Sequence, residues 1–236
     1  MKDGFIKVAA GTPDVQVADC EFNASEIIKM VHEMEAEGAK VMVFPELCIT
    51  AYTCGDLFWQ ENLLEEAKKQ LFRIAEETKD VEALIFVGLP LEYKGKLYNV
   101  AAGLNHGEVL GFVPKIHIPN YNEFYEARYF TSGENVDGTV TVRTEDYGFC
   151  HMDELDDNDD VEFDLEAEIE ALEEEEFEEL EEVEDDPDYI DEDEEELMEQ
   201  DIPISSNILF TCPDMPKLRI AAEICEDLWV LNPPSV

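Results

Sequence analysis

The spacing of apolar residues at the start of the chain alternates between short solid runs and helical repeats. The runs at 5–10, 41–44 and 83–89 are short and are followed by polar or turn-forming residues, so they predict buried strands. Residues 23–38 and 60–79, which lie between them, carry apolar side chains every three or four positions, as amphipathic helices do. Two strand–helix–strand units in succession predict an α/β domain whose sheet is covered by helices.

Both helices have recognisable features. Asn23 can accept a free backbone N–H at the start of a helix, and Glu26 stands at the reciprocal position of a capping box, so we expect the first helix to begin there. Gly38 is suited to end it, because glycine adopts left-handed backbone at low cost. The second helix has an apolar face made of Leu63, Leu64, Ala67, Leu71, Ile74 and Ala75.

The middle of the chain has the pattern of an antiparallel hairpin. Residues 97–115 contain two apolar-rich runs joined by Asn105, His106 and Gly107, residue types that tolerate the left-handed backbone of a tight turn. His106 is therefore expected in a turn and not as a ligand. Further strands are expected at 139–143, 208–212 and 218–224.

Negative charge is concentrated in one segment. The chain carries 60 Asp and Glu against 15 Lys and Arg, a formal net charge of -45, and residues 151–201 hold 31 of the acids and no Lys or Arg. Unpaired like charge predicts that this segment is disordered or, at most, an acidic amphipathic helix. We expect one domain, residues 1–150 and 202–236, interrupted by this acidic insertion. A surface this acidic repels phosphate backbones, so nucleic-acid binding is not expected.

The N-terminal sequence predicts neither export nor a membrane span, because it has no long apolar stretch and no small-residue cleavage site. A cytoplasmic protein is expected. The six cysteines show no C-x-x-C spacing, so in a reducing compartment we expect free thiols and no zinc or other metal site.

Three chemically distinct side chains directly follow predicted strands. Glu46 comes after 41–44, Lys115 after the second arm of the hairpin, and Cys225 after 218–224. In an α/β sheet, side chains at the carboxyl ends of strands converge on one edge, where ligands bind. Each residue alone also fits a plain structural role, as a solvated acid, a surface cation or a buried thiol, and spacing does not prove that they meet.

The three residues together suit acyl transfer on a carbon–nitrogen bond. A cysteine attacks as a thiolate and, with a free pKa of about 8.5, needs a base or a nearby cation at neutral pH. Glu46 could take the thiol proton and pass it to a leaving amine, and the Lys115 ammonium could stabilise the oxyanion. Glu226 and Asp227, next to Cys225, would oppose thiolate formation if they pointed at the sulfur.

Three motifs carry a family resemblance: VFPELCITAY at 43–52, PKIHIPNYNEFYEARYF at 114–130 and EICEDLWVLNPPS at 223–235. Together they resemble the nitrilase (carbon–nitrogen hydrolase) superfamily, and most closely the N-terminal glutaminase domain of glutamine-dependent NAD+ synthetases. GDLF at 55–58 and the aromatic residues of the second motif favour that branch over simple aliphatic amidases. The resemblance implies a four-layer α-β-β-α sandwich, here incomplete at the C-terminus, that assembles into homo-oligomers.

The resemblance also implies roles for individual residues. Glu46 would be the general base, Lys115 the cation that supports the oxyanion, and Cys225 the nucleophile. Glu123 matches the second acidic residue of the superfamily site, which holds the protonation and geometry of the other three. The glutamine pocket would be shaped by Tyr52, Tyr121, Phe124 and Glu226.

The activity implied is hydrolysis of the glutamine side-chain amide to glutamate and ammonia through a cysteine thioester, with the ammonia used for NAD+ synthesis. This step requires no metal or cofactor. ATP and Mg2+ would serve a synthetase region, whose Ser-Gly-Gly-x-Asp-Ser phosphate loop does not occur in this sequence. Two alternatives stay open: another amide, nitrile or N-carbamoyl substrate, and a non-catalytic interaction fragment whose acidic insertion binds a basic partner.

Overall fold

A seven-stranded sheet organises the part of the chain that the structure describes. The computed structural model describes residues 5–143, 199–213, 215–230 and 233–234, and the expected acidic insertion lies outside them up to residue 198. The strand order is β1-β2-β3-β4-β5-β7-β6. The strands are Val8–Ala10 (β1), Val41–Val43 (β2), Leu84–Tyr93 (β3), Lys96–Asn105 (β4), Glu108–Pro114 (β5), Asp137–Arg143 (β6) and Glu199–Ser205 (β7).

The strand directions decide which chain segments meet at one edge of the sheet. β1, β2 and β3 are parallel, β4 is antiparallel to both of its neighbours β3 and β5, and β7 is parallel to β5 and antiparallel to β6. β2, β3 and β5 therefore point the same way. Residues that directly follow β2 and β5 lie at the same edge, as the sequence predicted for Glu46 and Lys115.

The turn between β4 and β5 confirms the predicted hairpin. His106 and Gly107 both have left-handed backbone, with φ values of 50° and 81°. His106 is therefore a turn residue, as expected from the sequence.

One strand of this sheet, β7, was not predicted. It pairs with β6 along its whole length, from Asp137 opposite Ser205 to Arg143 opposite Glu199. Its sequence, EQDIPIS, contains only two strongly apolar residues, Ile202 and Ile204, and both are fully buried. Residues 199–201, which the sequence assigned to the acidic insertion, belong to this strand.

Two helices were predicted and both are present, as Cys20–Ala36 (α1) and Glu61–Glu77 (α2). The expected start of α1 was wrong. Asp19 caps the helix, because its carboxylate accepts a hydrogen bond from the backbone N–H of Phe22 at 3.0 Å. Asn23 is instead fully buried inside α1, where its amide bonds to the backbone of Gln16 and to the carbonyl of Ile49. A polar residue near a helix start can cap the helix or bond to another segment. Contacts with Gln16 and Ile49 decided the role of Asn23.

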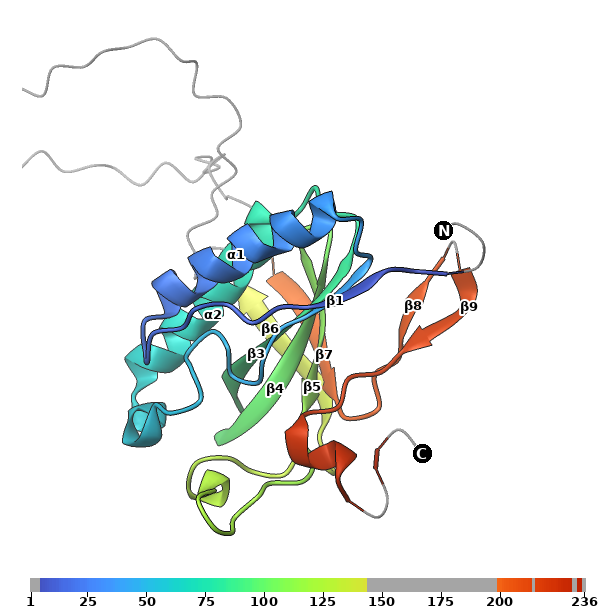
Figure 1. Cartoon of the computed structure of the whole chain (residues 1–236). Helices are drawn as coiled ribbons and strands as arrows, with labels where there is room; N and C mark the ends of the chain where they lie inside the picture. Colours follow the sequence, from blue (N-terminus) through green and yellow to red (C-terminus); the bar gives the residue numbers. More distant parts are fainter. Residues whose placement is uncertain (1–4, 144–198, 214, 231–232, 235–236) are drawn as a thin grey trace, which may run out of the picture. The chain divides into compact units, whose positions relative to one another are not determined.

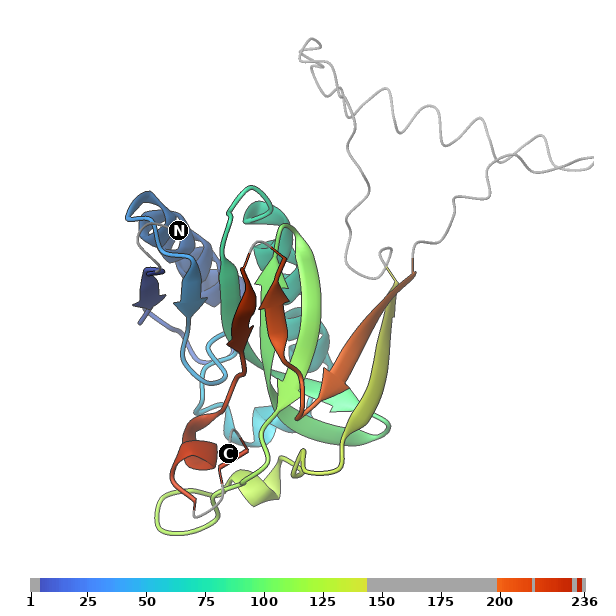
Figure 2. The ribbon, with the colours of Figure 1, turned by 90° about the vertical axis from the view of Figure 1, so that its right-hand side faces the viewer.

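The described residues form three layers. Figures 1 and 2 show α1 and α2 side by side on one side of the seven-stranded sheet, with the pair Phe210–Cys212 (β8) and Met215–Ile220 (β9) on the other. Phe210 packs against Phe86 and Val113 in a buried cluster that joins the two sheets. These are the helix, sheet and sheet layers of the expected nitrilase-like α/β sandwich. β9 ends at Ile220, earlier than predicted, and residues 221–224 continue from it without regular structure.

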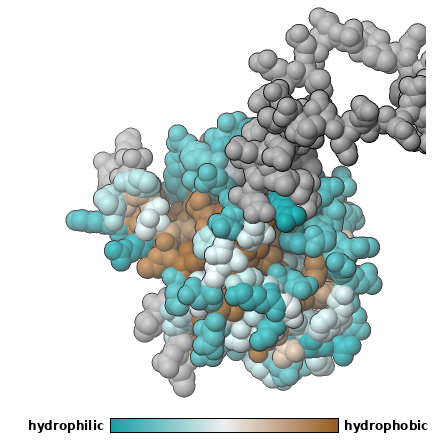
Figure 3. All heavy atoms as spheres, turned by 180° about the vertical axis from the view of Figure 1, so that it is seen from behind, coloured by the Kyte–Doolittle hydropathy of each residue, from teal (hydrophilic) through white to brown (hydrophobic). Residues whose placement is uncertain are grey.

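Apolar side chains also reach the surface of this unit. Figure 3 shows them gathered in one area of the face seen from behind. The large apolar side chains that are exposed include Val8 of β1 and Val43 of the neighbouring strand β2. Within the residues that the structure describes, no helix combines the length and apolar character that a membrane span requires.

Candidate active site

Glu46 lies in a tight turn that rests directly on β3. The turn starts where the N–H of Phe44 bonds to the carbonyl of Phe86, and the N–H of Ile49 returns to the carbonyl of Gly88. Gly88 permits this approach, because a Cβ at that position would lie 2.4 Å from the backbone nitrogen of Leu47. The side chain of Glu46 is only 16% exposed. The carboxylate is thus a positioned group and not a solvated loop acid.

Lys115 follows the last residue of β5 and is completely buried. Its backbone N–H bonds to the carbonyl of Asn99 on β4 at 2.9 Å. Its ammonium donates to Oε1 of Glu46 at 2.6 Å, and to Oε1 and Oε2 of Glu126 at 2.9 and 2.8 Å. The ammonium is thus held between two carboxylates, and its charge can support a nearby anion.

The buried carboxylates and the lysine ammonium stabilise each other. Burial opposes the charged form of Lys115, but the charge of Glu46 and the hydrogen bonds to both glutamates outweigh it, so the pKa of Lys115 is raised. Burial raises the pKa of Glu126, which is 4% exposed, and the Lys115 ammonium only partly offsets this. Tyr52 donates its hydroxyl to Oε1 of Glu126 at 2.8 Å. Burial and this hydrogen bond raise the pKa of Tyr52.

The supporting acid is placed differently from the prediction. Glu123 is exposed, and the glutamate that reaches Lys115 from this loop is Glu126, the first residue of a short 3-10 helix, Glu126–Arg128. The motif NYNEFYEARYF offers two acids three residues apart. The backbone N–H of Glu126 bonds to the carbonyl of Pro119, which folds the loop so that Glu126 points inward. Sequence spacing alone does not distinguish between the two acids.

Asn99 is a member of this site that sequence reasoning missed. It lies within β4, is 1% exposed, and donates from Nδ2 to Oε1 of Glu46 at 2.6 Å. Its Oδ1 is buried and has no hydrogen-bond partner among the described residues. Leaving a buried acceptor unpaired costs about 1–3 kcal/mol. The fold bears this cost at Oδ1 while Nδ2 donates to Glu46. The available signal was a polar residue in the middle of the apolar run LYNVAAGL.

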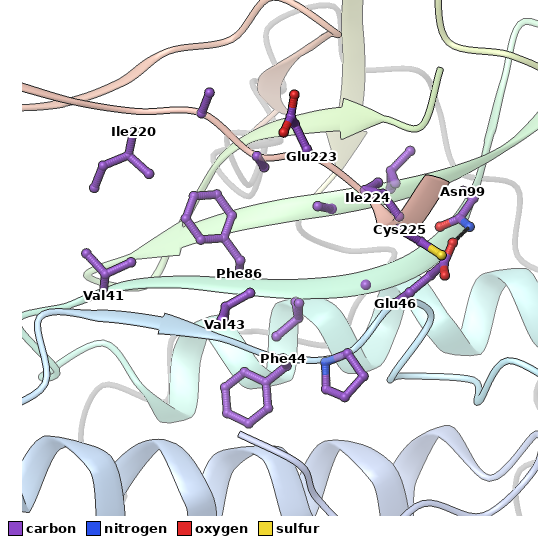
Figure 4. A pocket seen from close by; sticks show the side chains of 17 residues that line it. Val41, Val43, Phe44, Glu46, Phe86, Asn99, Ile220, Glu223, Ile224 and Cys225 are labelled. Carbon is purple, nitrogen blue, oxygen red and sulfur yellow. Dashed lines mark hydrogen bonds between the residues drawn. The ribbon is translucent and has the colours of Figure 1, made fainter. Parts of the chain in front are cut away.

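Cys225 begins a 3-10 helix, Cys225–Leu228, and adopts left-handed backbone with φ of 49°. Non-glycine residues seldom adopt this conformation outside functional sites and turns. The residue is exposed as a whole, and its sulfur lies beside the Glu46 carboxylate (Figure 4). Partial burial raises the pKa of the Cys225 thiol, the negative charge of Glu46 raises it further, and the Lys115 ammonium opposes both. The structure thus places the Cys225 sulfur beside Glu46, and the Glu46 carboxylate accepts a hydrogen bond from the Lys115 ammonium.

The two acids that follow Cys225 do not point at its sulfur. Asp227, which is 2% exposed, accepts hydrogen bonds from the backbone N–H groups of His117 at 2.7 Å, Ile116 at 3.2 Å and Ile224 at 3.3 Å. It therefore ties the segment that carries Cys225 to the segment that follows Lys115. Its carboxylate thus binds backbone N–H groups, and the Glu226 carboxylate binds the Tyr121 hydroxyl.

The residues expected to shape a glutamine pocket fall into two groups. Tyr52 contacts Glu126, as described above. Tyr121, Phe124 and Glu226 lie together: the Tyr121 hydroxyl is 3.0 Å from both carboxylate oxygens of Glu226, and its ring packs edge-on against Phe124 at 5.8 Å. This hydrogen bond raises the pKa of Tyr121. Glu226 directly follows Cys225, so this cluster is next to the sulfur in the chain.

A cavity of about 500 Å³ opens beside the site (Figure 4). Its polar end is formed by Glu46, Asn99 and Cys225. The rest is mainly apolar and lies between β2, β3 and β4 on one side and residues 220–224 on the other. Its volume is in the range of small-molecule sites. Among the residues that the structure describes, no group of three or more His, Cys, Asp or Glu is arranged to hold a metal ion.

This arrangement contains the groups that covalent hydrolysis requires. A thiol stands beside a carboxylate that can accept its proton, and a buried cation next to that carboxylate can offset negative charge that develops on a substrate. The cation and the base are held by a second carboxylate and by an amide. The geometry therefore supports nucleophilic chemistry at Cys225.

Comparisons with known proteins agree with this description. The carbon-nitrogen hydrolase family model matches residues 7–151, more than half of the chain. The chain is 28% identical to the glutamine-dependent NAD(+) synthetase of Mycobacterium tuberculosis over 232 residues, which is 98% of this chain and 26% of that protein. It is 39% identical to that of Aquifex aeolicus over 118 residues, 50% of this chain and 20% of that protein.

A solved structure gives the same result. The crystal structure of a glutamine-dependent NAD(+) synthetase from Cytophaga hutchinsonii matches 57% of this chain and 23% of that chain, with a TM-score of 0.54 and 30% identity. The chain thus spans about a quarter of the length of the curated relatives it matches. From the sequence matches, the shared fold and the site geometry, we conclude that the chain belongs to the carbon-nitrogen hydrolase family.

Proposed function

We propose that this chain hydrolyses the side-chain amide of glutamine to glutamate and ammonia through a thioester on Cys225. The observation that carries the proposal is the buried cluster of Glu46, Lys115 and Glu126, whose base lies beside the Cys225 sulfur at the polar end of a cavity. The similarity to the glutaminase part of glutamine-dependent NAD(+) synthetases supports glutamine as the amide.

The first half of the reaction forms the thioester. Glu46 takes the proton of the Cys225 thiol, and the sulfur attacks the amide carbon, so that a C–S bond forms and the carbonyl oxygen becomes an oxyanion. The Lys115 charge stabilises this oxyanion. When the intermediate collapses, the C–N bond breaks, and Glu46 returns the proton to the leaving nitrogen, which departs as ammonia.

The second half releases glutamate. Glu46 takes a proton from a water molecule, whose oxygen attacks the thioester carbon. The C–S bond breaks, the sulfur regains the proton from Glu46, and the product leaves as the side-chain acid, which loses its remaining proton to solvent to give glutamate. Every proton that leaves or reaches the sulfur moves through one carboxylate, so the proposed reaction depends on the placement of Glu46 relative to Cys225. The protein's own groups supply the nucleophile, the base and the stabilising charge.

Recognition of glutamine requires contacts to its α-ammonium and α-carboxylate. Glu226 offers a carboxylate next to the nucleophile, and it is held by the Tyr121 hydroxyl. We assign Glu226 to the α-ammonium group, with Tyr121 and Phe124 packed beside it; these three residues lie outside the lining of the cavity described above. Tyr52 acts in this proposal by holding Glu126, which in turn holds Lys115.

The ammonia would serve the synthesis of NAD+, because the matched relatives are named for that reaction. The synthetase step, with its ATP and Mg2+, would belong to a region that this chain does not contain. The chain spans about a quarter of those relatives, so this destination is part of the proposal.

Ammonia and glutamate release from glutamine tests the proposal. The wild-type chain should release both in equal amounts, and Cys225→Ala should release neither above background. Cys212→Ala, which alters a half-buried thiol on β8, is the matched control and should keep the activity. Equal release by wild type and Cys225→Ala would refute the assignment. Turnover of simple aliphatic amides in preference to glutamine would point instead to another amidase of the same family.

A further inference from the structure

The base of the proposed reaction is held by two donors, and both act on the same oxygen. Lys115 Nζ and Asn99 Nδ2 each lie 2.6 Å from Oε1 of Glu46. Oε2 accepts a hydrogen bond from neither of them. Figure 4 shows the carboxylate between the amide of Asn99 and the labelled Cys225, with the dashed hydrogen bond on the Asn99 side.

A single donor would not fix the orientation of this carboxylate. The terminal torsion of a glutamate side chain is broad, so a carboxylate held at one oxygen by one contact can still rotate. A second donor that approaches the same oxygen from another direction removes this freedom. Asn99 lies on β4 and Lys115 directly follows the neighbouring strand β5, with its N–H bonded to the carbonyl of Asn99, so the sheet fixes both approaches.

Asn99 is well placed for this purpose. It lies inside β4, opposite Pro90 of β3, and its backbone carbonyl accepts the N–H of Lys115 at 2.9 Å. One residue therefore sets the backbone position of Lys115 and the side-chain position of Glu46. Its own Oδ1 has no partner among the described residues. The hydrogen bond from Nδ2 to Glu46 is therefore the contact that orients the amide.

We propose that Asn99 is a positioning residue for the reaction: its amide holds Oε1 of Glu46 and so turns the other carboxylate oxygen toward the Cys225 thiol. The inference rests on the proposed function, because it takes Glu46 to be the base for Cys225. In this proposal Asn99 affects the reaction by orienting the Glu46 carboxylate, and not by stabilising the sheet.

Alkylation of Cys225 by iodoacetamide measures this positioning without a substrate. The rate is followed against pH in the full chain by mass spectrometry of the peptide that contains Cys225. The Glu46 charge disfavours the thiolate, so Glu46→Gln should move the pH midpoint of alkylation down. Asn99→Ala, which frees the carboxylate to turn away, should move the midpoint in the same direction by a smaller amount.

The double variant separates positioning from a structural role. If Asn99 acts through Glu46, then Asn99→Ala should have no further effect in the Glu46→Gln background. A structural defect would instead shift the midpoint in both backgrounds. Asn105→Ala is the matched control, because Asn105 is also on β4 and uses its amide for the carbonyl of Ala83. It should keep the wild-type midpoint.

Asn99→Asp provides a second test if the alanine variant folds poorly. It keeps the shape of the side chain but places a second carboxylate against Glu46, so the alkylation midpoint should rise above that of wild type. A general loss of structure is not expected to raise the alkylation midpoint, and an unchanged or lowered midpoint in Asn99→Asp would contradict the inference.

Kinetics with glutamine give the second readout. Asn99→Ala should lower kcat by about 10- to 100-fold, the range expected for losing a hydrogen bond to a charged group, with KM changed by less than about two-fold. Equal and additive shifts of the alkylation midpoint in both backgrounds, or an unchanged kcat, would overturn the inference. Failure of wild type to hydrolyse glutamine, with the alkylation results as expected, would refute the proposed substrate and leave the role of Asn99 standing.

Discussion

Replacing Lys115 by methionine tests whether the buried ion cluster holds the site together. Methionine has about the same length as lysine but no charge, so Lys115→Met leaves Glu46 and Glu126 facing each other without a cation. The lysine is completely buried, and its three hydrogen bonds span 2.6 to 2.9 Å. The variant therefore removes the whole electrostatic compensation of two largely buried acids.

The expected loss is large because both acids stay in place. Removing one partner of a buried ion pair costs about 3–5 kcal/mol, since the remaining charge is left uncompensated. We expect Lys115→Met to lower the free energy of unfolding by about that amount near neutral pH. Lys29→Met is the control. Lys29 pairs with Glu26 on the exposed face of α1 at 3.5 Å, and such surface pairs contribute only about 0–1 kcal/mol.

The loss should also depend on pH. Burial raises the pKa of Glu126, and Lys115 lowers it more than the hydrogen bond from Tyr52 does. Without the lysine, the folded state holds a proton on Glu126 at pH values where the unfolded state has lost it. The folded state then binds more protons, so the stability of the variant falls as pH rises, by up to about 1.4 kcal/mol per pH unit. Lowering the pH should restore part of the stability.

Denaturant unfolding monitored by circular dichroism measures these quantities. The difference between wild type and Lys115→Met should be larger at about pH 8 than at about pH 5, with similar m-values. A difference below about 1 kcal/mol at both pH values would show that the cluster does not stabilise the fold. A difference of the expected size that does not change with pH would refute the role assigned to Glu126.

Two further variants test how the segments around the site are held. Gly88→Ala would place a Cβ 2.4 Å from the backbone nitrogen of Leu47, so it should displace the turn that carries Glu46 and lower glutamine turnover by at least about 10-fold. Gly111→Ala on β5 is the control. Its Cβ would meet mainly the movable end of a side chain, so this variant should retain most of the turnover. Asp227→Ala leaves three backbone N–H groups without their acceptor, so the unfolding free energy should fall by about 2–4 kcal/mol, and an unchanged midpoint would contradict the assigned contacts.

The sequence was sufficient for most elements of the fold. Helical spacing identified α2 and its buried face, and apolar runs identified the strands on which Glu46 and Lys115 depend. These patterns are local, because the spacing of apolar residues within one helix or strand indicates which of its faces is buried. The strand β7 escaped this reasoning because its alternation is short and follows an acidic stretch.

The candidate residues Glu46, Lys115 and Cys225 could also be proposed from the sequence, because each follows a predicted strand and lies in a motif that resembles one family. Glu46 and Lys115 fall within the residues that the family model matches, and Cys225 lies beyond them. The proximity of Glu46 and Lys115 came from strand directions, which bring the ends of β2 and β5 to one edge of the sheet. Cys225 reaches this edge from the segment that follows β9, in the other sheet.

Only the tertiary structure decided which polar groups complete the site. Glu126 and not Glu123 reaches Lys115, because a backbone hydrogen bond to Pro119 folds the loop. Asn99 reaches Glu46 from a strand more than fifty positions away in the sequence, and Asp227 turns to the backbone of residues 116 and 117. Such contacts depend on the distance between segments that are remote along the chain. Local spacing carries no information about that distance.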